Sequence, residues 1–284
     1  MRRAAAETRR LIRVAIIGMG AIGHVVAKAL DGRVGLVRVD RTRWPLTDAE
    51  PAVDAAVVCV KTYGNAWAAE VARRILAPGG VIVTIQNGLG NVETLGAAVG
   101  PSRVALGVIY VGAELSGVEL EATGPGRVEI GRPEDPAARA HVEGLARVLA
   151  AGGMTVGVVD DPWPSVWRKL VVNAAMNPTT ALFGLHNPEL LEHPAGRPLA
   201  DELARETASV ATAAGVPIDP EKAPEMWHSV AAFVNRSSML QDVEAGRTTE
   251  VDAINGAVAR EGARRGVAAP LNDAVRVLVE SLAA

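Results

Sequence analysis

The stretch Gly18-Met19-Gly20-Ala21-Ile22-Gly23 decides the fold of the first half of this chain. It follows an apolar, β-branched run over residues 11–17 and precedes a helix-like stretch over residues 21–30. The spacing G-x-G-x-x-G between a strand and a helix permits a tight turn, and it lets backbone N–H groups at the helix start bind a pyrophosphate. In that setting the six residues predict a dinucleotide site.

Strand-like and helix-like segments alternate beyond this turn. Helix-like residues 66–76 and 136–151 separate apolar runs, which occupy residues 34–39, 55–60, 81–85, 104–111 and 154–159. Such an order predicts an α/β fold, a Rossmann-type doubly wound parallel sheet. Residues 118–130, broken by Gly124-Pro125-Gly126, are interpreted as a hairpin.

The pattern changes near residue 160, after which no strand-like run recurs. Helices are expected over residues 164–185, 196–214, 222–245, 249–265 and 271–282. We therefore predict a dinucleotide-binding domain over residues 1–160 and an all-helical, substrate-binding and catalytic domain over residues 161–284. The Arg-rich residues 1–10 are followed by no apolar signal region, so we expect a frayed leader.

Composition excludes several classes of protein. The net charge of −3 provides no basic field for nucleic acid or an anionic membrane, and no apolar run has the ~18 residues that a membrane span needs.

The single cysteine, Cys59, excludes an internal disulfide and favours a reducing cytoplasm; its apolar surroundings predict an inert thiol. The five histidines lack metal-site spacing, so no metal is expected. Apolar helices in the second half are compatible with a homodimer and equally with a single core.

The end of the second apolar run bears on the choice between NAD and NADP. Asp40 lies about 20 residues after the glycine turn, where a carboxylate would bind a ribose 2′-hydroxyl. Arg38, Arg41 and Arg43 surround it and could bind a 2′-phosphate instead. A solvated charged loop is the simpler interpretation, and the residues alone leave the choice open.

A polar helix face contains the best candidate for a catalytic residue. Lys169, Asn173 and Asn177 are spaced i, i+4, i+8 and share one face of the predicted helix. Only four of the 29 basic residues are lysines, and unlike arginine a lysine can give up its proton. Asparagine is a poor helix former, so two of them suggest a use other than a solvated stripe.

A second polar segment runs from Asn235 to Asp252. Gly246 is expected to end one helix, and Thr249-x-x-Asp252 to form a capping box for the next, with Glu250 in its first turn. Simple compensation of the helix dipole would also explain Glu250, and Ser238 could be plain surface.

Taken together, these segments resemble the ketopantoate reductases (2-dehydropantoate 2-reductases) from about residue 12 to 283. The likeness rests on the glycine turn and on five further motifs: Val-Lys-Thr (60–62), Gln-Asn-Gly-Leu-Gly-Asn (86–91), Trp-Arg-Lys-Leu-Val-Val-Asn-Ala-Ala-Met-Asn-Pro (167–178), Ser-Ser-Met-Leu-Gln-Asp-Val-Glu-Ala-Gly-Arg (237–247) and Thr-Glu-Val-Asp-Ala-Ile-Asn-Gly (249–256). The segment from Asp40 to Asp54 is shorter than is usual in that family.

The resemblance implies reduction of 2-dehydropantoate to (R)-pantoate by NADPH, for pantothenate and coenzyme A synthesis. It implies that Lys169 is the general acid. The residues implied to bind the keto acid are Asn87, Asn173, Asn177, Asn187, Asn235 and Ser238. Those implied to contact the cofactor, besides residues 18–23, are Lys61, Asn87, Ala113 and Glu250. Arg41 is a further predicted cofactor contact, on the ground of its position beside Asp40.

Two other functions fit the sequence less well. The first is an NAD(P)H-dependent reductase of another branched 2-keto acid that uses the same residues. The second is a non-catalytic protein that senses NADP(H). Such a sensor would need only the glycine turn, so the presence of Lys169, Asn173, Ser238 and Glu250 argues against it.

Overall fold

A computed structural model describes residues 11–43, 52–117, 119–232 and 236–282. The chain forms two compact units, each treated separately below. The sheet unit comprises residues up to 60, 66–85 and 95–159, and the helical unit comprises residues 61–65, 86–94 and 160 onward. Two short segments of the predicted first domain, 61–65 and 86–94, therefore group with the helices.

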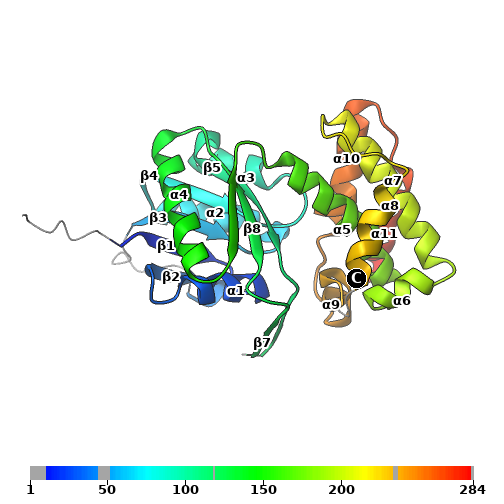
Figure 1. Cartoon of the computed structure of the whole chain (residues 1–284), viewed down its shortest axis with the longest axis horizontal. Helices are drawn as coiled ribbons and strands as arrows, with labels where there is room; N and C mark the ends of the chain where they lie inside the picture. Colours follow the sequence, from blue (N-terminus) through cyan, green and yellow to red (C-terminus); the bar gives the residue numbers. More distant parts are fainter. Residues whose placement is uncertain (1–10, 44–51, 118, 233–235, 283–284) are drawn as a thin grey trace, which may run out of the picture. The chain divides into compact units, whose positions relative to one another are not determined.

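A seven-stranded sheet forms the centre of the sheet unit, in the order β2-β1-β3-β4-β5-β8-β9 (Figure 1). All neighbouring pairs are parallel except β5 and β8. The strands are β1 (Arg13–Ile17), β2 (Gly35–Val39), β3 (Val53–Val58), β4 (Leu76–Thr84), β5 (Val104–Tyr110), β8 (Arg127–Gly131) and β9 (Thr155–Val159). The strand order reverses beside β1, and the crevice beyond the carboxyl ends of strands at such a point is where doubly wound sheets bind ligands.

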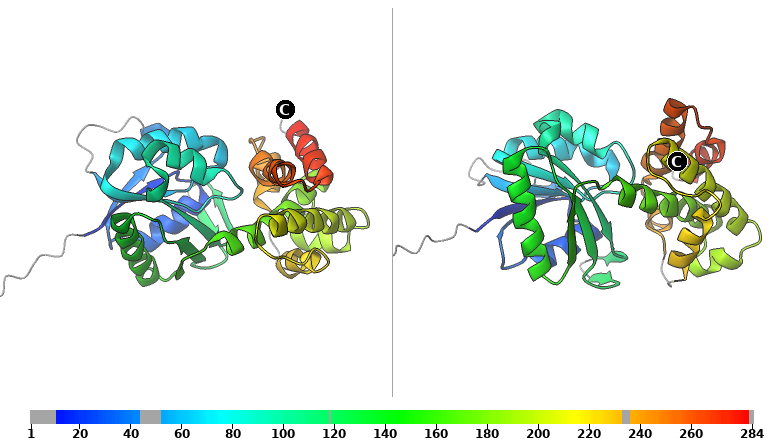
Figure 2. Two further views of the ribbon diagram at one scale, coloured as in Figure 1. Left: turned by 90° about the horizontal axis from the view of Figure 1, so that it is seen from above. Right: turned by 45° about the horizontal axis from the view of Figure 1, so that its top comes forward.

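Helices cover both faces of this sheet. Helices α1 (Ala21–Leu30) and α4 (Pro136–Ala151) contact each other on one face, while α2 (Asn65–Ile75) and α3 (Asn91–Val99) lie on the other (Figure 2). Apolar side chains without exposed surface, such as those of Val14, Ile16 and Leu145, fill the core between strands and helices. The predicted Rossmann-type sheet is thus confirmed.

The predicted hairpin over residues 118–130 is wrong. A two-stranded ribbon forms instead between β6 (Ala113–Ser116) and β7 (Glu119–Ala122). β8 pairs with β5 and β9, because Val128 and Ile130 are apolar and are buried in the main sheet. The Gly124-Pro125-Gly126 stretch therefore connects two sheets rather than two strands of one hairpin.

The helical unit is built around α5 (Trp163–Phe183), which packs against most of its other helices. These are α6 (Asn187–Glu192), α7 (Gly196–Ala213), α8 (Ala223–Ala231), α9 (Ser238–Glu244), α10 (Ala257–Arg265) and α11 (Pro270–Leu282). Trp227 lies in the core of this unit without exposed surface, and its indole donates to Asp201 at 2.9 Å. In the described part of the chain, no helix is long and apolar enough to span a membrane.

Two predicted helices differ from the observed ones. The helix expected over residues 222–245 is divided into α8 and α9. The helix expected over 249–265 begins with a π-helical segment, Asp252–Gly256, which we call the π turn. The predicted capping box is not formed, because the Thr249 hydroxyl accepts from the N–H of Val251 at 3.4 Å and the Asp252 carboxylate pairs with Arg260 at 2.6 Å.

Candidate active site

The glycine turn lies directly after β1 and consists of residues 18–23. Gly18 has φ +103°, and a Cβ there would lie 2.6 Å from the backbone nitrogen of Val60. A Cβ at Gly23 would lie 2.0 Å from the Gly18 oxygen. Both glycines are therefore required by the backbone itself.

Gly20 is different, because no contact among the described residues requires a glycine at that position. Its φ is −78°, and a Cβ would meet no atom of those residues within 4 Å. It is the N-cap of α1, where free N–H groups and the helix dipole favour an anion. Open space at a glycine of ordinary conformation fits the close approach of a pyrophosphate, so this turn fits a dinucleotide.

The residues at the end of β2 and directly after it show which side chains are available to bind the ribose. One oxygen of Asp40 accepts from the backbone N–H and the hydroxyl of Thr42, at 2.9 and 2.5 Å, and so stabilises the short 3-10 helix Arg41–Arg43. Arg38 pairs with Asp31 at 2.9 Å. The Arg41 guanidinium lies 6.0 Å from the centre of the Trp67 ring and is exposed. Arg41 thus combines an exposed positive charge with a neighbouring aromatic ring.

Residues 86–94 join the helical unit through the π turn. The N–H of Leu89 donates to the Ala253 oxygen at 3.0 Å, and a Cβ at Gly88 would lie 2.3 Å from that same oxygen. Gly88 has φ +78°, so both its conformation and this close contact require glycine. The contact brings Asn87 to the residues that precede the π turn.

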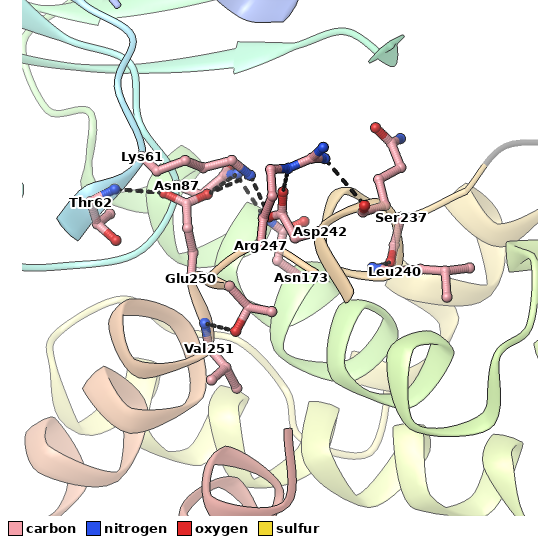
Figure 3. Close-up of polar contacts among 12 residues, drawn as sticks. Lys61, Thr62, Asn87, Asn173, Ser237, Leu240, Asp242, Arg247, Glu250 and Val251 are labelled. Carbon is pink, nitrogen blue, oxygen red and sulfur yellow. Dashed lines mark hydrogen bonds and ion pairs between the residues drawn. The ribbon is translucent and has the colours of Figure 1, made fainter. Parts of the chain in front are cut away.

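Lys61 belongs to an ion-pair cluster in the helical unit. Its ammonium lies 2.8 Å from Asp242 and 3.5 Å from Glu250 (Figure 3). Burial by itself would lower the pKa of Lys61, but the two carboxylates outweigh burial and the pKa is raised. Asp242 is buried and also accepts from Arg247 at 3.1 Å. Sequence reasoning did not single out Asp242 as a site residue, although it lies within the motif over residues 237–247.

Glu250 connects several predicted site residues (Figure 3). One of its oxygens accepts from the backbone N–H of Thr62 at 2.9 Å, and the other accepts from the Asn87 amide at 3.5 Å. The Asn87 oxygen in turn accepts from the Asn173 amide at 3.4 Å. Glu250 is only 5% exposed, so compensation of a helix dipole does not account for its contacts.

Lys169 lies on α5, one turn before Asn173. Burial lowers the pKa of Lys169 to about 8, although the nearby charge of Glu250 acts in the opposite direction. A lysine with a pKa close to neutral pH can both hold and release a proton during turnover. We refer to Lys61, Asn87, Lys169, Asn173, Asp242 and Glu250 as the Lys169 cluster.

Other predicted site residues lie around this cluster or apart from it. Asn177 follows Asn173 on α5, is 4% exposed, and its side chain has no hydrogen-bond partner among the described residues. Ser238 is half-buried at the start of α9; its neighbour Ser237 is structural, capping α9 through Leu240 and bonding to Thr180. Asn235 lies outside the described residues.

Two further residues implied by the resemblance are placed as follows. Ala113 begins β6, which packs against α1 in the sheet unit. Asn187 has no exposed surface at the start of α6. That the Asn187 side chain binds the keto acid stays a prediction.

Two more sequence predictions concern cysteine and metal. Burial raises the pKa of the Cys59 thiol to about 12, so the thiol stays protonated and unreactive at neutral pH. Within the described ranges, no three His, Cys, Asp or Glu side chains are grouped as metal ligands would be.

Comparison with known protein families gives two matches along the chain. Residues 36–135 match the family model described as ketopantoate reductase PanE/ApbA, and residues 163–283 match its C-terminal model. The first match begins after the glycine turn, and the second covers nearly the whole helical unit.

Individual proteins are also similar to this chain. A 2-dehydropantoate 2-reductase of Halobacterium salinarum is 36% identical over 245 residues, which is 84% of this chain and 78% of that protein. The crystal structure of a 2-dehydropantoate 2-reductase from Geobacter metallireducens is 26% identical and covers 95% of this chain and 99% of its own, with a TM-score of 0.84. A D-mandelate dehydrogenase bound to NADH and anilino(oxo)acetate has a TM-score of 0.82, with 96% of this chain and 98% of that chain covered; at 22% identity it shows the fold alone.

Proposed function

Because the chain belongs to the ketopantoate reductase family, we propose that it reduces 2-dehydropantoate to (R)-pantoate with NADPH, a step toward pantothenate and coenzyme A. The observation that carries this proposal is Lys169, whose pKa is lowered to about 8 on a helix face shared with two asparagines. The sheet unit would bind the cofactor, and the helical unit would provide the catalytic lysine.

Each residue has a defined part in the proposed reaction. When bound, NADPH supplies the hydride that the keto carbon accepts. Lys169 is mostly protonated at neutral pH, so its ammonium can stabilise the charge that develops on the keto oxygen and then donate a proton to it. The Asn173 and Asn177 amides and the Ser238 hydroxyl can bind the carboxylate and hydroxyl groups of the substrate without adding charge.

Cofactor contacts are proposed in both units. Residues 18–23 would bind the pyrophosphate, as the open space at Gly20 allows. Ala113 is proposed as a further contact in the sheet unit, and Lys61, Asn87 and Glu250 as contacts in the helical unit. Arg41 would bind the 2′-phosphate, which favours NADPH over NADH, since one oxygen of Asp40 is already occupied by Thr42.

A single cysteine supports a reducing compartment such as the cytoplasm.

A steady-state assay tests the proposal directly. The loss of reduced cofactor is followed by absorbance with 2-dehydropantoate and a panel of other 2-keto acids, each with NADPH and with NADH. We expect the highest kcat/KM for 2-dehydropantoate with NADPH. A higher kcat/KM for another keto acid would refute the substrate, and no turnover under any condition would refute the enzyme and favour a sensor.

A further inference from the structure

Helix α5 contains a proline in its interior, directly after its substrate-binding face. Pro178 has no backbone N–H, so the carbonyl of Ala174, four residues earlier, lacks its helical donor. Ala174 has no exposed surface, so water is not available to replace that donor. A buried carbonyl without a partner costs about 1–3 kcal/mol.

Asn255, in the π turn, supplies the missing donor. Its side-chain amide nitrogen donates to the Ala174 oxygen at 2.9 Å and to the Asn272 side-chain oxygen at 3.0 Å. Both partners are acceptors, so the orientation of the Asn255 amide is fixed. The side-chain oxygen of Asn255 is buried and has no hydrogen-bond partner in the described part of the chain. This indicates that Asn255 acts as a hydrogen-bond donor through its amide nitrogen.

A carboxylate fixes the direction of this hydrogen-bond network. The amide nitrogen of Asn272 donates to Glu206 at 3.0 Å, so the Asn272 oxygen must face Asn255. The same carboxylate accepts from the backbone N–H groups of Leu271 and Asn272 at the start of α11, each at 3.0 Å. A continuous series of hydrogen bonds therefore joins Glu206 to the backbone of α5.

The two ends of the Asn255 contact lie close in sequence to residues of the proposed active site. Ala174 lies between Asn173 and Asn177 on α5. On the other side, the π turn begins two residues after Glu250, which bonds to Asn87 and Thr62. One buried side chain thus connects the backbone of the asparagines with the backbone of Glu250.

We propose that Asn255 is a positioning residue, which replaces the N–H that Pro178 lacks and holds Asn173 and Asn177 in register with Glu250. The proposal rests on the proposed function for what these residues bind. Without the Asn255 donor, the Ala174 carbonyl must move to find water, and the two asparagine amides move with it. Binding of the keto acid is then weakened, while the cofactor contacts of residues 18–23 are unchanged.

The test uses Asn255→Ala and a second variant that restores the donor from the backbone. For Asn255→Ala we expect KM for 2-dehydropantoate to rise about tenfold, equivalent to about 1.4 kcal/mol, with KM for NADPH unchanged. Amide hydrogen exchange in residues 170–183 should become faster. In Asn255→Ala with Pro178→Ala, residue 178 again provides an N–H to Ala174, so KM should return to within about threefold of its original value.

Thr207→Val provides the matched control. The Thr207 hydroxyl is buried at the far side of the same network, 3.5 Å from the Asn272 oxygen, and it contacts no residue of the Lys169 cluster among the described contacts. This variant should lower the melting temperature and leave both KM values unchanged, as any purely structural loss would.

The possible outcomes separate the alternatives. An Asn255→Ala protein that melts earlier but keeps its KM would overturn the positioning role, and so would a double variant whose KM stays raised. If Asn255→Ala does not fold, the double variant should fold, and its failure would also overturn the proposal. Absence of turnover in the unmodified protein refutes the proposed function alone, because hydrogen exchange in residues 170–183 still tests the contact.

Discussion

The glycine turn and the Lys169 cluster are built in opposite ways. The turn is six consecutive residues, and its geometry is set by contacts within the turn and with the two residues that follow β3. The cluster collects side chains from residue 61 to residue 250, and its properties depend on burial and on neighbouring charges. A backbone site can therefore be recognised in one short stretch of sequence, whereas a side-chain site depends on how distant segments pack.

The largest effect is expected from removing the group that carries the chemistry. Lys169→Ala should lower kcat by on the order of 10² to 10⁴, because a positioned general acid contributes about that much. NADPH binding, followed by fluorescence titration, should be retained. Lys222→Ala is the control, since Lys222 is an exposed lysine of the same unit. Near-normal turnover of Lys169→Ala would exclude Lys169 as the general acid.

The turn can be tested with two glycines that differ in what requires them. Gly23→Ala should destabilise the fold, because its Cβ would overlap the Gly18 oxygen. Gly20→Ala should keep the melting temperature, because no atom of the described residues lies within 4 Å of the added Cβ. It should raise KM for NADPH by about 10- to 100-fold if the methyl group blocks a charge-assisted hydrogen bond. An unchanged KM in Gly20→Ala would show that the pyrophosphate does not approach there.

Arg41 tests whether the side chains beside the turn select the cofactor. Arg41→Ala should reduce the preference for NADPH over NADH by about tenfold, which corresponds to the loss of one charge-assisted contact. The ratio of kcat/KM for the two cofactors measures this, with the exposed Arg33 replaced by alanine as the control. If the ratio stays constant in Arg41→Ala, the 2′-phosphate is read elsewhere.

The smallest effect concerns the electrostatics of the cluster. Lys169 must be protonated to act as an acid, so kcat for reduction should fall as pH rises through about 8. Glu250→Gln removes a charge that favours protonation of Lys169, so the midpoint should move to lower pH. A pH profile of kcat measures both, and an unmoved midpoint would mean that another group titrates.

The sequence determined the parts of this protein that local rules control. Consecutive apolar runs and glycines specified the parallel sheet, the turn after β1 and the helical second half, because strand and helix periodicity are short-range properties. The i, i+4, i+8 spacing placed Lys169, Asn173 and Asn177 on one helix face for the same reason. The resemblance to a family then indicated the reaction, which spacing alone does not.

Only the tertiary structure decided the remainder, because it depends on contacts between distant segments. The strand partners of residues 119–122 and 127–131 follow from where apolar side chains can be buried. The pairing of Lys61 with Asp242 joins residues 181 positions apart, and burial gives Lys169 its lowered pKa. Pro178 is visible in the sequence, but that Asn255 supplies its missing donor depends on how the π turn packs against α5.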